Sequence, residues 1–182
     1  KSFVSLRRFA PDSVVNMGGA KHTIKNFTRG AYVGGLVGRA NNSQLDSCFT
    51  STSTYSYDTV TTAAKDKNVG AIIGLVGSKT IIANSFTLGL ASVGTTNTKG
   101  VAGGLVGYVS SGTLTIADSL VAATVSEYND KVERGLTVGQ CGDNANVKAN
   151  NVIVASTNAL LISKTSVVDP ILSGGAEADN IA

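Results

Sequence analysis

The feature that most constrains the fold is a glycine-rich hexapeptide that recurs along the chain at nearly constant spacing. It reads VGGLVG at 33–38, VGAIIG at 69–74, AGGLVG at 102–107 and, in a weaker form, RGLTVG at 134–139. Successive closing glycines are 36, 33 and 32 residues apart. Periods of 20–50 residues are typical of solenoids, propellers and linear arrays. The chain is therefore expected to fold as a stack of similar units, each packed on its neighbours.

A second element follows each hexapeptide at a similar distance. It reads LDSCFT at 45–50, IANSFT at 82–87, IADSLV at 116–121 and VKANNVIV at 147–154. A weaker relative, TIKNFT at 23–28, precedes the first full repeat and contains Asn26. Aligning these segments predicts a ladder of polar residues at one corner of the stack, formed by Asp46, Asn84, Asp118 and Asn150.

Two interpretations of this polar ladder are open. Asn and Asp at a corner can bond to the backbone amides of adjacent coils. Their oxygens are also suitable ligands for Ca²⁺. The structural interpretation is favoured, because the chain lacks the dense G-G-x-G-x-D spacing of calcium-binding solenoids. We therefore predict no metal site.

Composition favours strands over helices. The 182 residues include 21 Gly and only two Pro, and short β-branched runs are bounded by Gly, Ser and Asn. The third repeat divides into three such runs, whereas a propeller blade needs four strands in about 40–45 residues. The sequence thus predicts an all-β chain. More specifically, it predicts a β-solenoid (β-helix) of about four coils, with roughly three strands per coil and about 4.8 Å between coils.

The glycines of the hexapeptide are expected at tight corners, because Gly tolerates a positive φ and a close approach of two backbones. Between them, Leu36, Ile72, Leu105 and Leu136 are expected to stack as an aliphatic interior, each buried Leu contributing about 1.5–3 kcal/mol. The predicted structural glycines are Gly34, Gly35, Gly38, Gly70, Gly74, Gly103, Gly104, Gly107 and Gly139.

The repeats divide the chain into three parts. Residues 30–156 carry the repeats, residues 1–29 are expected to form a partial coil or cap, and residues 157–182 a cap or exit linker. The open ends of a coil present unpaired strand edges that invite pairing with another chain. Neighbouring domains, or copies of the same protein, are therefore the expected partners.

The combination of GGLVG with a following I-x-N/D-S-F/L, about ten residues later, resembles the GLUG motif repeat. The resemblance covers roughly residues 30–156, and it is weakest in the fourth repeat. Such repeats occur in filamentous-haemagglutinin-like adhesins, in protist surface proteins and in non-catalytic regions of bacterial immunoglobulin A peptidases. The resemblance implies a non-catalytic spacer or adhesive module that is extracellular or at the cell surface, with a host receptor or glycan as a further partner. It supplies no catalytic residues.

Catalytic chemistry is not indicated by the residues. The one histidine, His22, lies outside the clear repeats, and no carboxylates lie two to four residues apart within a repeated strand. The remaining acids fall between the repeats, namely Asp58, Asp66, Glu127, Asp130 and Glu133. We predict no enzyme, no catalytic residue and no cofactor. The alternative is a carbohydrate-binding or carbohydrate-cleaving β-helix, a fold that can host paired carboxylates.

Several further partners and sites follow from composition. A net charge of +3 without a dense basic run does not favour nucleic acid, and no apolar run reaches the 18 residues of a membrane helix. The Thr-x-Thr pairs, such as Thr50–Thr52 and Thr113–Thr115, are expected to fall out of register between coils, which disfavours a flat face that binds ice or another crystalline surface. Cys48 and Cys141 lie three repeats apart, beyond disulfide reach. The two sequons, at Asn26 and Asn41, are candidate glycosylation sites of an extracellular chain.

Overall fold

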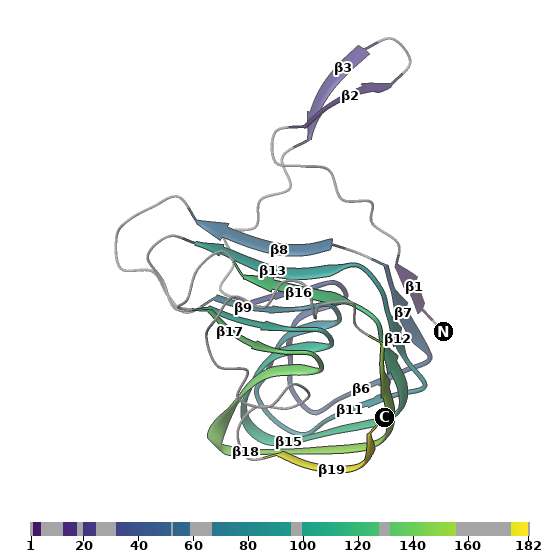
Figure 1. The fold of residues 1–182 in the computed structure, drawn as a ribbon, viewed down its shortest axis with the longest axis vertical. Coiled ribbons are helices and arrows are strands. Elements are labelled where there is room, and N and C mark those ends of the chain that lie inside the picture. The colour runs from purple at the N-terminus through teal and green to yellow at the C-terminus, as the bar shows by residue number, and fades with distance from the viewer. Residues whose placement is uncertain are drawn as a thin grey trace.

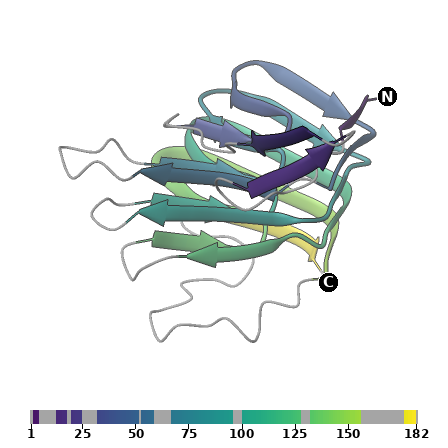
Figure 2. The same ribbon diagram turned by 90° about the horizontal axis from the view of Figure 1, so that it is seen from above.

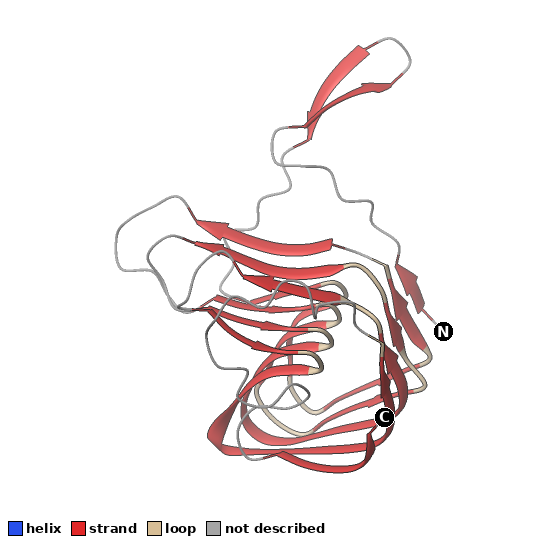
Figure 3. Ribbon diagram, viewed as in Figure 1, coloured by secondary structure: helices blue, strands red, loops and turns tan. Residues whose placement is uncertain are grey.

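The computed structural model of the protein describes residues 2–4, 13–17, 20–24, 32–51, 53–58, 67–95, 100–127, 132–155 and 176–181. All regular elements in these segments are strands (Figure 3). Among them there is accordingly no helix long and apolar enough to cross a membrane. The prediction of an all-β chain is confirmed.

The strands group into four consecutive units. The first unit contains β4 (Tyr32–Gly34), β5 (Val37–Ala40), β6 (Ser43–Asp46), β7 (Cys48–Thr50) and β8 (Ser53–Asp58). The second contains β9 (Lys67–Gly70), β10 (Ile73–Val76), β11 (Thr80–Ala83), β12 (Phe86–Thr87) and β13 (Leu90–Thr95). The third contains β14 (Gly100–Gly103), β15 (Val106–Val121) and β16 (Thr124–Glu127), and the fourth contains β17 (Val132–Gly135) and β18 (Val138–Val154). The prediction of roughly three strands per unit fits the third unit, whereas the first two each contain five shorter ones.

Equivalent strands of successive units pair in parallel. They form three curled sheets (Figures 1 and 2). The largest has ten strands, in which β15 pairs with β18 on one side and with β10, β11 and β12 on the other, and these three pair in turn with β5, β6 and β7. The other two have the orders β4-β9-β14-β17 and β8-β13-β16. One row of paired residues runs through all four units, and it consists of Val37, Ile73, Val106 and Val138. Because parallel strands lie about 4.8 Å apart, the sequence repeat becomes a repeat in space. The result is an all-β, parallel arrangement consistent with a β-helix-like fold.

Four further strands lie outside the units. β1 (Ser2–Val4) pairs in parallel with β7, and β19 (Ala176–Ile181) pairs in parallel with β18. β2 (Ser13–Met17) and β3 (Ala20–Ile24) form an antiparallel pair. Of the weak repeat predicted at 23–28, only residues 23–24 are described, and they belong to β3, which pairs with β2 and not with a strand of the units. The place beside Phe49 in the register row is taken by Phe3.

The interior is an aliphatic column fully enclosed in the middle units. Ile72, Ile73, Leu105 and Val106 are all 0% exposed. The expected contribution of Leu136 is wrong, because the backbone amide of Leu105 donates to Thr137 O (2.9 Å), which makes Thr137 the equivalent of Leu105. Thr137 is fully buried, and its hydroxyl has no hydrogen-bond partner among the described residues.

The hexapeptide makes a sharp turn, here called the arch, between β4 and β5 and at the equivalent place in each other unit. At the arch the backbone before the turn lies close to the backbone after it. Gly34, Gly70, Gly103 and Gly135 pair in one row, so Gly135 joins the predicted glycines. A Cβ on any of them would collide with the carbonyl oxygen three residues later in its own arch. The closing glycines face the neighbouring unit: a Cβ on Gly107 would lie 2.6 Å from Gly74 O. Close approach is the reason for glycine here.

The expected positive φ at these glycines is wrong. Among the described glycines, only Gly89 (φ 104°) and Gly112 (φ 76°) have a positive φ, and neither belongs to the arch. The left-handed conformation occurs instead mainly at polar residues of another corner.

Candidate functional site: the polar corner and the aromatic column

The polar corner is a row of four residues in the left-handed conformation. Ser47, Asn84, Asp118 and Asn151 have φ values of 53°, 50°, 47° and 53°. An ordinary side chain loses about 1–2 kcal/mol in this region, but Asn and Asp tolerate it because their short polar side chains bond locally. The backbone turn between β11 and β12, and the same turn in the other units, therefore selects these residue types.

The side chains of the corner pair across units. Asn84 Nδ2 donates to Asp46 Oδ1 (2.7 Å), and Asn151 Nδ2 donates to Asp118 Oδ1 (2.7 Å). Within the first unit, Ser47 Oγ donates to Asp46 Oδ2 (3.2 Å). Each carboxylate thus meets an amide donor of the next unit, and such charge-assisted bonds are stronger than neutral ones.

The predicted ladder is displaced by one residue at two of its members. Asn84 and Asp118 lie in the corner row, but Asp46 and Asn150 lie one residue earlier, in a row with Ala83 and Ala117. The cause is that Asp46-Ser47 and Asn150-Asn151 each offer two adjacent polar residues. Alignment by polarity alone does not separate them, whereas backbone conformation does.

The backbone bonding expected of the ladder belongs to a row of buried serines that the sequence analysis missed. Ser85 Oγ donates to Ala83 O (2.7 Å) and accepts from Cys48 N (3.2 Å). Ser119 Oγ repeats this pattern, donating to Ala117 O (2.7 Å) and accepting from Ser85 N (3.2 Å). The sequence signal was a serine directly after the corner residue in the second and third units.

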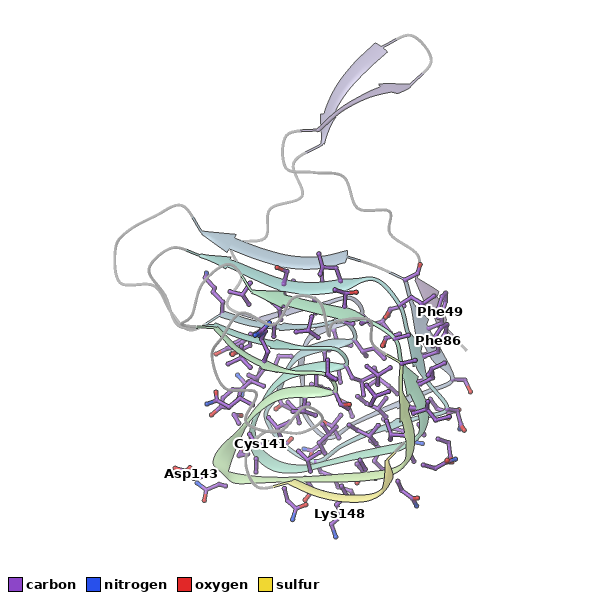
Figure 4. The ribbon with its side chains drawn as sticks, in the orientation of Figure 1. Phe49, Phe86, Cys141, Asp143 and Lys148 are labelled. Atoms are coloured by element: carbon purple, nitrogen blue, oxygen red, sulfur yellow. The ribbon has the colours of Figure 1, made fainter. Side chains whose placement is uncertain are left out.

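An aromatic column runs beside the polar corner on the outer face. The rings of Phe49 and Phe86 stack with centroids 5.1 Å apart and planes at 17° (Figure 4). The same register row continues to Leu120 and to Ile153, which is 51% exposed. Stacked aromatic pairs contribute about 0.5–1.5 kcal/mol beyond their buried area. The column is thus an apolar stripe that crosses all four units.

The described residues hold no cluster of three or more His, Cys, Asp or Glu that could bind a metal ion. Both Cys48 and Cys141 are free thiols. Burial raises the pKa of Cys141 to about 11, so this thiol is protonated at neutral pH. A protonated thiol is a poor nucleophile and a poor metal ligand.

The remaining residues singled out by sequence are scattered. Asn41 is exposed at the bend between β5 and β6, and Ser43 Oγ of its sequon donates to Asn41 O (2.9 Å). His22 pairs with Val15 in the β2–β3 hairpin. Asn26, Asp66 and Asp130 lie outside the described residues.

No family model matches this chain, and no curated protein sequence matches it. Among solved structures, the fold is similar to that of a "putative immunoglobulin A1 protease" from Bacteroides ovatus, with a TM-score of 0.53 and 19% sequence identity. The match covers 82% of this chain and 45% of the neighbour, so the chain spans less than half of the neighbour's length. At this level of identity the likeness concerns the fold alone.

Proposed function

We propose that the chain is a non-catalytic module of a surface or extracellular protein, built as a β-solenoid of four coils. The observation that carries the proposal is the unbroken parallel row of equivalent residues, from Val37 to Val138. Each added unit lengthens such a stack by one strand spacing, about 4.8 Å. A stack that grows in this regular way suits a spacer, a stalk or a fibre component. The outer faces of the stack are where adhesion would take place.

The family resemblance and the structural neighbour support the same context. GLUG-like repeats occur in non-catalytic regions of bacterial immunoglobulin A peptidases, and the neighbour's name is that of such a protease. We infer that residues 30–156 form the repeat region of a comparable surface protein. Residues 1–29 and 157–182 flank this region, and β1 and β19 each add one parallel strand to it.

The carbohydrate-related alternative is less well supported. A phenyl ring that holds a sugar by stacking has to present its face, but Phe49 and Phe86 turn one face of each ring toward the other. The polar corner offers Asn and Asp groups, yet its carboxylate, Asp118, and the adjacent Asp46 already accept bonds from Asn151 and Asn84. Stacking and corner bonding both serve cohesion between units.

Enzymatic and binding assays on the purified chain test this proposal. The chain is incubated with a panel of polysaccharides and with immunoglobulin A, and new reducing ends or new fragments are measured. We expect no turnover above a heat-denatured sample, and a glycan and whole-cell binding panel separates an adhesive face from a plain spacer. Reproducible cleavage of any of these substrates would overturn the non-catalytic role.

A further inference from the structure

The N-terminal edge of the stack is open where the equivalent edges are paired. Each of β4, β5, β6 and β8 pairs with only one other described strand, that of the second unit. The arch interior is correspondingly uncovered: Val33, Leu36 and Val37 are half-buried, whereas Ile72 and Ile73 are 0% exposed. Among the described residues, this edge therefore has backbone groups that no neighbouring strand pairs.

The carbonyl groups of the arch show what is missing. Ile72 O accepts from Leu36 N (3.1 Å) and Val37 N (3.0 Å) of the preceding unit. Leu105 O accepts in the same way from Ile72 N (2.9 Å) and Ile73 N (3.1 Å). The equivalent acceptor of the first unit, Leu36 O, has no such pair of donors among the described residues. An arch placed before it would supply them.

Gly38 is the second indication. A Cβ on Gly74 would lie 2.5 Å from Val33 N, and one on Gly107 would lie 2.7 Å from Val69 N, so the preceding unit forces glycine at both positions. A Cβ on the exposed Gly38 would meet only Tyr32 O, at 3.1 Å. The described neighbours therefore do not require glycine at Gly38, whereas a preceding arch would.

β1 supplies the third indication. Ser2, Phe3 and Val4 pair with Cys48, Phe49 and Thr50, the same partners that Ser85, Phe86 and Thr87 have on the other side. The sequences agree as well, since Ser2-Phe3 repeats Ser85-Phe86. β1 thus occupies the position of a β12-type strand in a preceding unit. In the first two units the arch is followed by two strands, β5 and β6 or β10 and β11, and then by β7 or β12; in the third and fourth units a single strand, β15 or β18, covers the same stretch.

We propose that the edge formed by β5 and β6 pairs with the arch and the β11-type strand of a further unit of this repeat. β1 is the β12-type strand of that unit. Chain direction puts that arch on the N-terminal side of Ser2. The partner is thus a parallel segment with the pattern of the hexapeptide, in which Val-Gly is followed by any residue, two aliphatic residues and a second Gly. The inference deepens the proposed solenoid role and rests on it.

The test is a fusion in which a copy of Asn68–Asn84 is placed directly before Ser2 in place of Lys1. This restores the order Asn-Ser-Phe found at Asn84–Phe86. Amide hydrogen exchange in β5 and β6 is expected to slow at least about tenfold, while β15 serves as the internal reference. The matched control is the same fusion carrying the equivalent of Gly70→Val in the added copy, which blocks the arch.

Gly38→Ala gives an independent readout. Without the fusion, this substitution is expected to shift the unfolding midpoint only slightly, whereas in the fused chain it should abolish the gain in protection. Unchanged exchange in β5 and β6 on fusion, or an equal effect of Gly38→Ala in both chains, would overturn the proposal. So would sedimentation that shows the unfused chain dimerising through this edge, because the occupant would then be a second copy. None of these outcomes bears on the turnover assays.

Discussion

Replacing Thr137 with Val is expected to stabilise the protein. Thr137 occupies the interior position that Leu36, Ile72 and Leu105 hold in the other units, and its Oγ1 is buried without a hydrogen-bond partner in the described structure. A buried, unpaired hydroxyl costs about 1–3 kcal/mol in proteins. Val has nearly the same shape and is a good strand residue. Its backbone carbonyl still accepts from Leu105 N and Val106 N.

The expected gain from Thr137→Val is about 1–2 kcal/mol in the free energy of unfolding. For a chain of this size it corresponds to a rise in Tm of roughly 3–6 °C. Urea unfolding followed by circular dichroism measures the midpoint, and an unchanged slope shows that the unfolded state is unaffected.

Thr87→Val is the matched control. Thr87 is equally buried, but its Oγ1 donates to Gly104 O (3.2 Å). Removing this bond is expected to lower the free energy of unfolding by about 0.5–1.5 kcal/mol. If Thr137→Val destabilised the protein, or if both substitutions shifted the midpoint in the same direction, the assignment of Thr137 to an apolar interior row would be refuted.

Three further predictions concern the corner, the thiol and the aromatic column. Asp118→Ala is expected to destabilise by about 1–2 kcal/mol more than Asp118→Gly, because only Gly accepts the positive φ freely; equal costs in thermal melts would contradict this. Since the pKa of Cys141 is raised to about 11, its contribution to stability should be constant below pH 9 and fall as the pH rises towards 11; the loss should vanish in Cys141→Val. Phe86→Ala should cost more than Leu88→Ala, because Phe86 stacks on Phe49 whereas Leu88 is 38% exposed; chemical denaturation compares them.

The fold class could be predicted because the repeat is expressed in residue types that backbone geometry demands. Gly74 and Gly107 recur since a side chain there would collide with the neighbouring backbone. Once such positions recur at a constant period, parallel stacking of equivalent strands is the simplest arrangement that satisfies them. Strand number per unit was less predictable, because small differences at the corners decide whether β11 and β12 stay separate or merge as in β15.

The candidate corner could be predicted only to within one residue. Hydrophobic and polar patterning located it, but choosing between Asn150 and Asn151 requires the φ angle, which the sequence does not encode directly. The same limit explains Leu136: matching residues by apolar character assigned it to the interior, whereas pairing gives that position to Thr137. The buried serine row was missed since serine is common in this chain and its burial is set by tertiary packing.

The central claim is that equivalent residues of successive units lie above one another in a single column. Gln44, Ile81, Thr115 and Lys148 form one such row, and its two end members are exposed. Spin labels at Gln44→Cys and Lys148→Cys, in a Cys48→Ser, Cys141→Val background, allow their separation to be measured by pulsed electron–electron double resonance. Three strand spacings predict a backbone separation of about 14–15 Å and a narrow distribution. A main distance beyond about 30 Å would show that the first and fourth units are not stacked in register.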